Sequence, residues 1–213
     1  MLITLLERQR GRRRVNVHID GTFAFSLPAD LVALHHLRQG QDVAPALVDA
    51  LREADARQRC MDSALRLLAR RPRSERELRD ALARRRFERV HIAEAIARLR
   101  TMGYLDDAAF ARFWVENRDA SSPRSRRLLR AELRGRGVGA PIAAEATAEV
   151  DDEDAAYRAA ARRLRAFSGL DEESFRRRLG GFLLRRGFAY AVCERAVARC
   201  WREISAPPGG ADA

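Results

Sequence analysis

The sequence predicts a mainly α-helical protein: an elongated array of three tandem three-helix repeats with a small N-terminal β-hairpin and short-helix extension. Three observations support this fold class. Apolar residues alternate around one Asp-Gly dipeptide near the N-terminus, which is typical of a hairpin. From Pro45 onward the apolar period becomes about 3.6 residues, which indicates amphipathic helices. The helical part then repeats itself, and this repetition decides the architecture.

The N-terminal segment carries the β signal. The runs VNVHID and TFAFSL alternate apolar and other residues on either side of Asp20-Gly21, which tolerates the positive φ of a type I′ turn. Residues 2–8 can add a third strand, and Pro28 opens a short helix that we expect to end at Gly40. So few strands cannot build a core alone, so we expect this segment to cap the helices that follow.

Nine helices are expected after the hairpin. Ser74 and Glu77 have capping-box spacing, and Asp106 and Asp107 are N-cap candidates for an aromatic-rich helix. The expected helices are 45–70, 74–85, 89–101, 107–119, 123–135, 140–149, 152–167, 171–186 and 189–204. The expected domains are 1–43 (extension), 44–106, 107–150 and 151–205 (repeats one to three), with a disordered tail over 206–213.

Gap-free alignment relates the three repeats. Apolar positions coincide in three sets: Leu78, Leu129 and Leu179; Leu82, Leu133 and Leu183; Phe87, Val138 and Phe188. A unit this small buries little surface alone, so neighbouring units must stack. Chance similarity among helices rich in Ala, Arg and Leu is the alternative, but it does not explain why core positions and the turn recur together.

The composition excludes several classes of protein. The chain has 213 residues, 46% hydrophobic and 33% charged, which is too apolar for a disordered chain. No apolar run approaches the roughly 20 residues that span a bilayer, and the first residues do not have the pattern of a secretory signal. The three cysteines lack a CxxC pair, which favours free thiols in a reducing compartment. We therefore expect a cytoplasmic protein without membrane contact.

No catalytic set is found. The four histidines lack metal-ligand spacing, and no nucleophile elbow, Walker loop or dinucleotide-binding motif occurs. The acidic run at residues 151–154 could hold a divalent ion, but capping of a helix N-terminus explains it better. We expect a protein that is not an enzyme and has no cofactor and no metal.

The basic charge points to a polyanionic or acidic partner. All 41 cationic residues are arginines, the formal net charge is +11, and residues 60–106 carry 12 arginines against 7 acidic residues. A GC-rich genome and solvated helix faces are the alternative explanation. Because guanidinium groups bind phosphates and carboxylates, we expect arginines near the same helix of each repeat to form a basic stripe. The candidate binding residues are Arg70, Arg71, Arg73, Arg76, Arg84, Arg85, Arg86, Arg124, Arg126, Arg127, Arg176 and Arg177.

One segment is rich in aromatic residues. Tyr104, Phe110, Phe113 and Trp114 have spacings that place them mostly on one helix face. We expect them to pack between neighbouring repeats, with a stacking platform for nucleic-acid bases as the alternative.

Two motifs resemble the RecX family of recombination regulators. They are RPRSEREL at 71–78 and GYLDDAAFA at 103–111, with Arg118 closing the helix. The tandem three-helix repeats and the opening hairpin with its Leu37-to-Gln41 turn are similar to that family as well, so the resemblance covers about residues 1–205.

The resemblance implies a regulatory protein of recombination and DNA repair. Such a protein binds the RecA recombinase filament on single-stranded DNA and mainly inhibits strand exchange and ATP hydrolysis. Its arginines would face acidic filament surface or the phosphates of single-stranded or duplex DNA. We expect it to act as a monomer.

Two other functions stay open. Residues 74–105 are similar to a winged helix-turn-helix core with 89–100 as recognition helix, which would make a transcription regulator, although a helix rather than a hairpin wing follows. A general single-strand nucleic-acid binder would bind DNA alone with a steep salt dependence.

The stacked-repeat prediction has a consequence for size in solution. An elongated array has a radius of gyration clearly above the ~17 Å of a compact globule of this length. Small-angle X-ray scattering measures this radius, and a value close to that of a compact sphere would contradict the array.

Overall fold

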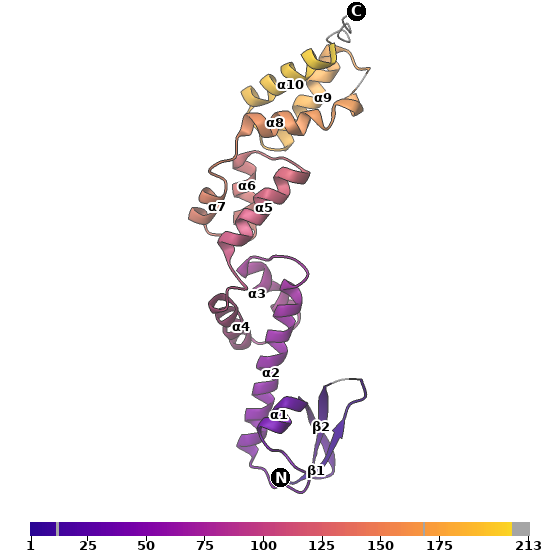
Figure 1. Ribbon diagram of the computed structural model, residues 1–213, viewed down its shortest axis with the longest axis vertical. Helices are drawn as coiled ribbons and strands as arrows, with labels where there is room; N and C mark the ends of the chain where they lie inside the picture. The colour runs from indigo at the N-terminus through magenta and orange to yellow at the C-terminus, as the bar shows by residue number, and fades with distance from the viewer. Residues whose placement is uncertain (12, 168, 206–213) are drawn as a thin grey trace, which may run out of the picture. The chain divides into compact units, whose positions relative to one another are not determined.

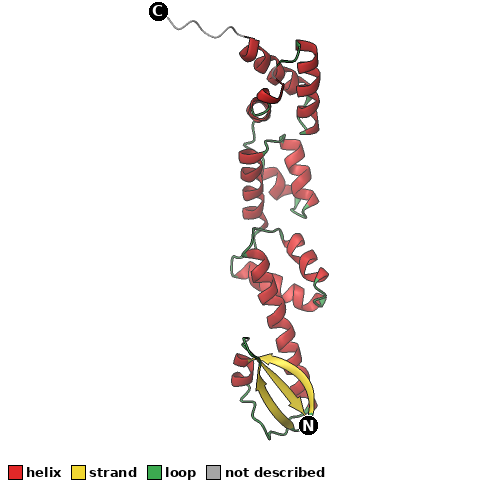
Figure 2. Ribbon diagram, turned by 90° about the vertical axis from the view of Figure 1, so that its right-hand side faces the viewer, coloured by secondary structure: helices red, strands yellow, loops and turns green. Residues whose placement is uncertain are grey.

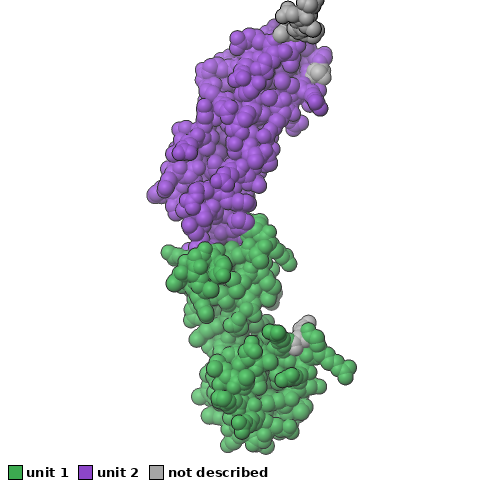
Figure 3. Space-filling model, viewed as in Figure 1, with its two compact units in different colours: residues 1–71, 78–104 green, residues 72–77, 105–213 purple. Residues whose placement is uncertain are grey.

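A computed structural model describes residues 1–11, 13–167 and 169–205 (Figure 1). The expected disordered tail at 206–213 lies outside these residues. The chain divides into two compact units (Figure 3): unit 1 is Met1–Arg71 with Leu78–Tyr104, and unit 2 is Pro72–Glu77 with the residues from Leu105 onward.

Unit 1 begins with a three-stranded antiparallel sheet. Its strands are β1 (Ile3–Arg8), β2 (Arg14–Ile19) and β3 (Thr22–Pro28), in that spatial order. At the β2–β3 turn the φ angles of Asp20 and Gly21 are +50° and +83°, as a type I′ turn requires. The predicted hairpin and the predicted third strand are both confirmed.

The helix after the sheet is shorter than expected. Helix α1 spans Ala29–Leu34 and ends well before Gly40. His36 has a φ of +49°, and the Leu37 N–H donates to the Val32 carbonyl at 3.0 Å, which closes a Schellman turn. The prediction was wrong because a histidine, rather than the glycine, adopts the left-handed conformation that ends this helix.

The sheet shares its core with the next helix (Figure 2). Helix α2 (Pro45–Leu68) contributes Val48 and Leu51 to the cluster around Ile3, Val17 and Leu27. The strands therefore depend on α2 to bury their apolar face, as expected for so small a sheet. Two further helices complete unit 1: α3 (Glu75–Arg84), whose first turn belongs to unit 2, and α4 (Arg89–Thr101).

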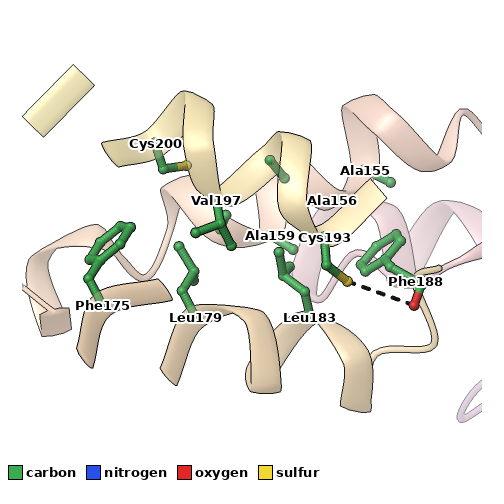
Figure 4. Packing of buried hydrophobic residues seen from close by; sticks show 12 residues of the cluster. Ala155, Ala156, Ala159, Phe175, Leu179, Leu183, Phe188, Cys193, Val197 and Cys200 are labelled. Atoms are coloured by element: carbon green, nitrogen blue, oxygen red, sulfur yellow. Dashed lines mark hydrogen bonds between the residues drawn. The ribbon is translucent and has the colours of Figure 1, made fainter. Parts of the chain in front are cut away.

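Unit 2 contains two three-helix groups. The first has α5 (Asp107–Ser121), α6 (Arg126–Gly135) and α7 (Ala140–Ala146), and the second has α8 (Asp152–Ala161), η1 (Leu164–Phe167), α9 (Glu172–Arg185) and α10 (Tyr190–Ser205). In the core of the second group, Leu179 and Leu183 of α9 face Cys193 and Val197 of α10 (Figure 4). The aligned leucines of all three repeats are at most 2% exposed, which confirms the repeat alignment.

Three helix boundaries in unit 2 differ from expectation by three residues or more. One is the end of α7, which lies at Ala146 rather than at residue 149. Helix α6 begins at Arg126 rather than at residue 123, because Ser125 is its N-cap and accepts the Leu128 N–H at 3.1 Å. The helix expected over 152–167 ends at Ala161 and continues as the 3₁₀ turn η1. The three-residue period of a 3₁₀ turn places Leu164 and Phe167 on the same side, against the third-repeat core.

The aromatic segment is only partly in the core. Phe110 is buried and Trp114 half-buried in the core of the second repeat, with Leu133 and Val138. Phe113 is 39% and Tyr104 60% exposed, so the prediction that all four aromatic residues pack between neighbouring repeats was wrong. Phe113 lies on α5 between the buried side and solvent, and it does not belong to the buried cluster of Phe110, Leu133 and Val138.

One set of contacts occurs twice within unit 2. The Ser74 hydroxyl donates to the Arg136 carbonyl at 2.5 Å, and the Ser125 N–H donates to the Arg186 carbonyl at 3.1 Å. The residue after each arginine is a glycine, Gly137 or Gly187. Each time, the first turn of one helix therefore rests on the turn that follows a later helix, with a separation of about one repeat along the chain. We call this arrangement the glycine joint.

Each joint glycine is fixed by both conformation and space. Gly137 and Gly187 have φ of +89° and +86°. A Cβ at Gly187 would lie 2.6 Å from the Ser125 Oγ and 2.8 Å from the Leu128 Cβ, and one at Gly137 would overlap the Arg76 side chain. A side chain at either position would both strain the backbone and open the joint.

We predict that Gly137→Ala lowers the free energy of unfolding of unit 2 by about 2–4 kcal/mol, from left-handed backbone strain plus overpacking. Gly169→Ala is the matched control, because Gly169 also has a positive φ (+83°) but faces open space. It should cost only about 1 kcal/mol. Urea unfolding followed by circular dichroism measures both, and equal losses would show that the joint is not tightly packed.

Candidate partner-binding surface

The candidate arginines divide into exposed residues and residues held by internal contacts. The side chains of Arg70, Arg84 and Arg86 are exposed and have no hydrogen bond or ion pair within the described part of the chain. They lie after α2, in the last turn of α3 and in the turn before α4. Arg86 holds the left-handed position (φ +63°) that Gly137 and Gly187 hold in the other repeats. These three guanidinium groups are available to a partner.

The neighbouring candidates Arg71, Arg73 and Arg85 differ from one another in exposure and in contacts. Arg85 donates to the Ser63 hydroxyl of α2 at 2.5 Å. Arg71 is exposed and Arg73 half-buried in the loop before α3. Arg85 therefore has an internal role that its position in the arginine run does not reveal.

Four candidates are tied to acceptors within unit 2. Arg76 donates to the Gly135 carbonyl, and Arg126 donates to the Val150 carbonyl through Nε (3.1 Å) and Nη2 (2.5 Å). Arg127 approaches the Gly187 carbonyl at 3.5 Å, and Arg124 pairs with Glu132. Since these arginines stabilise turns and helix ends, the predicted basic stripe is interrupted by residues with structural contacts.

Glu132 anchors the most connected of these contacts. Its carboxylate accepts the Trp114 Nε1–H at 2.8 Å, the Arg118 Nε–H at 3.0 Å and the Arg124 guanidinium. The Arg136 guanidinium stacks 3.6 Å from the centre of the Trp114 ring, on which Arg118 also lies. Burial lowers the pKa of Arg124, but a guanidinium remains charged in proteins. Sequence reasoning missed Glu132, although it is the sole acidic residue of α6.

The third repeat keeps its candidates on the surface. Arg176 pairs with Glu172 one turn earlier at 2.6 Å, an exposed pair that contributes little to stability. The Arg177 side chain is exposed and has no ion pair or hydrogen bond in the described ranges.

A hollow on the second repeat contains arginines that sequence reasoning missed. It has a volume of about 510 Å³ and lies between α6 and α7. Its lining residues are Arg126, Arg127, Arg130, Arg134, Ala140, Ala143, Ala144 and Asp152. Arg130 and Arg134 were not candidates, although the four-residue spacing from Arg126 is the signal of a common helix face. We call this site the α6 hollow.

The acidic run at residues 151–154 has structural contacts. Asp151 caps α8 by accepting the Glu153 N–H at 2.8 Å, as predicted, and Asp152 accepts the Arg126 N–H at 2.7 Å. Arg158 donates to Asp119 and to Asp154, and its hydrogen bonds lower the pKa of Asp119. Within the described ranges, no three His, Cys, Asp or Glu residues form a group that could hold a metal ion. Nor does any helix there have the length and apolarity to cross a bilayer.

Comparisons with known proteins identify the family. Four RecX family models match successive parts of the chain: the N-terminal domain at residues 1–44, and the first, second and third three-helix domains at 60–99, 106–146 and 151–197. The chain belongs to the RecX family. The resemblance stated from two motifs is thereby confirmed.

Individual relatives agree with the family models. A "Regulatory protein RecX" of Streptomyces lividans is 38% identical over 142 residues, covering 65% of this chain and 76% of the relative. That of Amycolatopsis mediterranei is 36% identical over 154 residues, covering 71% and 86%. A crystal structure of a regulatory protein RecX, with 21% identity, matches 92% of this chain and 98% of its own with a TM-score of 0.66, which shows a shared fold.

We predict that Glu132→Ala lowers the free energy of unfolding by about 2–4 kcal/mol, because three partly buried donors lose their acceptor. Glu145→Ala, at an exposed site of α7 in the same repeat, is the control and should change it by less than about 0.5 kcal/mol. Urea unfolding followed by tryptophan fluorescence compares the two. A similar effect of both substitutions would mean that the Glu132 contacts do not stabilise the repeat.

Proposed function

We propose that this chain regulates recombination by binding the RecA recombinase filament on single-stranded DNA, and that it mainly inhibits strand exchange and ATP hydrolysis. The observation that carries the proposal is the succession of all four RecX domains along one chain. The regulator acts in the cytoplasm as a monomer, and it acts by binding rather than by catalysis.

The exposed arginines supply the contacts for such binding. Arg70, Arg84 and Arg86 of the first repeat and Arg177 of the third are accessible and without internal ion pairs among the described residues. Each can pair with a carboxylate of the filament or with a DNA phosphate. Several weak contacts in one chain add through effective concentration, so that a filament with many copies of one subunit is a suitable partner.

The transcription-regulator alternative receives less support. Within the described residues from Ala29 onward, no strand follows that could serve as the wing of a winged helix. Direct nucleic-acid binding is supported by a separate observation, the α6 hollow, and is treated below.

We predict that Arg70→Glu/Arg84→Glu raises the concentration needed for half-inhibition of RecA ATP hydrolysis by at least about tenfold, the equivalent of one lost contact of 1.4 kcal/mol. Thermal stability should barely change, because exposed charges contribute little to folding. The assay is single-stranded-DNA-dependent ATP hydrolysis by RecA, with the wild-type chain as reference.

The control is Arg10→Glu/Arg202→Glu, which makes the same charge change at exposed arginines outside the candidate set. It should inhibit within about twofold of the wild type. If the wild-type chain has no effect on RecA, the proposed function is wrong. If both double variants inhibit equally, Arg70 and Arg84 are solvated residues without a role in binding.

A further inference from the structure

The α6 hollow carries more positive charge than its surroundings neutralise. Four arginines line it, against one carboxylate, that of Asp152. Asp152 already accepts the backbone N–H of Arg126 at 2.7 Å. The Arg134 side chain is exposed and has no ion pair or hydrogen bond within the described part of the chain. The hollow is therefore strongly attractive to an anion.

Two of the guanidinium groups are held in fixed orientation. The Arg130 Nε–H donates to the Thr147 hydroxyl at 2.8 Å, and this buried hydroxyl donates in turn to the Ala143 carbonyl at 2.9 Å. Arg126 is oriented by the Val150 carbonyl. A guanidinium has five N–H donors, so Arg130 uses one in the hydrogen bond to Thr147 and can donate the others to a ligand. Such pre-orientation lowers the entropy cost of binding.

The spacing of the arginines suits a regular row of anions. Arg126, Arg130 and Arg134 follow one another at four-residue intervals, about 6 Å apart along the helix axis. Neighbouring phosphates on a nucleic-acid strand have a comparable separation. The opposite wall is formed by alanines of α7, which allow close approach, and no aromatic side chain is among the lining residues for base stacking.

We propose that the α6 hollow binds the sugar–phosphate backbone of a nucleic-acid strand without reading its base sequence. Phosphate contacts position a protein on nucleic acid but carry no sequence information, in agreement with a lining that has guanidinium groups and small apolar residues only, apart from Asp152. This inference goes beyond the proposed function, because it requires no recombinase.

The second repeat is the one equipped for this binding. At the positions aligned with Arg126, Arg127, Arg130 and Arg134, helix α3 has Glu75, Arg76, Arg79 and Ala83, and helix α9 has Arg176, Arg177, Gly180 and Leu184. Neither of these helices has the full row of arginines. The site is thus a property of one repeat, and its removal leaves the aligned helices unchanged.

The test measures the binding of fluorescein-labelled oligo(dT) to the full chain by fluorescence anisotropy, without recombinase, over a range of salt concentrations. Arg130→Gln/Arg134→Gln should raise Kd at least tenfold and make the slope of log K against log salt shallower by about 1.4, the loss of two phosphate contacts. Arg134→Gln alone, which breaks no internal contact, should weaken binding in the same direction. The control Arg98→Gln/Arg202→Gln removes the same charge from exposed sites on α4 and α10.

The outcomes distinguish the possible ligands of the α6 hollow. Weaker binding by the hollow variants alone, with similar affinity for oligonucleotides of different sequence, supports the proposal. Equal binding by the hollow and control variants overturns it. Hollow variants that retain oligonucleotide binding but lose inhibition of RecA would assign the hollow to protein carboxylates instead. If inorganic phosphate binds to the wild-type chain and more weakly to the hollow variants, while oligo(dT) does not bind, the hollow is a site for free phosphate only.

Discussion

The close approach of a glycine turn to the first turn of another helix is the constraint on which unit 2 depends. Gly137 and Gly187 combine positive φ with the absence of space for a Cβ. Around each of them, a buried serine and an arginine carbonyl are joined by a hydrogen bond. The aspartate at the start of a later helix, Asp107 or Asp152, also accepts an N–H from the helix whose first turn rests on that glycine. The recurrence of this joint explains why the turn repeats together with the core leucines.

The joint also determines which arginines are available for binding. A guanidinium beside a turn finds carbonyl oxygens that need donors, so Arg76, Arg126 and Arg127 direct at least part of their hydrogen-bonding capacity inward. Arg86 stands where the other repeats have the joint glycine, and it is exposed. This repeat position therefore has a packing role in the second and third repeats, and it is available for binding in the first. An arginine count along the chain cannot separate these roles.

Periodic features of this chain could be predicted from the sequence, and features that depend on one competing contact could not. The hairpin at Asp20-Gly21 and the two sets of core leucines follow from local turn chemistry and from apolar spacing. The end of α1 at His36 and the 3₁₀ turn at Leu164–Phe167 do not, because each depends on a local choice between hydrogen bonds of similar strength. At the candidate surface, the arginines were found but their partners were not. Glu132 and Thr147 become visible only when the fold brings distant residues together.

Helix α6 shows how one short helix can combine stability with a binding surface. Leu129 and Leu133 face the core, Glu132 fixes Trp114 and two arginines, and Arg130 and Arg134 line the hollow. A helix distributes residues at 100° intervals, so these three tasks occupy different sides and need not compete. Glu132 neutralises cations on its own side and leaves the row of arginines on the other side without a counter-charge except Asp152. An arginine-rich composition therefore does not by itself explain this row of arginines. The single acidic residue of the same helix lies on another side, where it does not neutralise their charge.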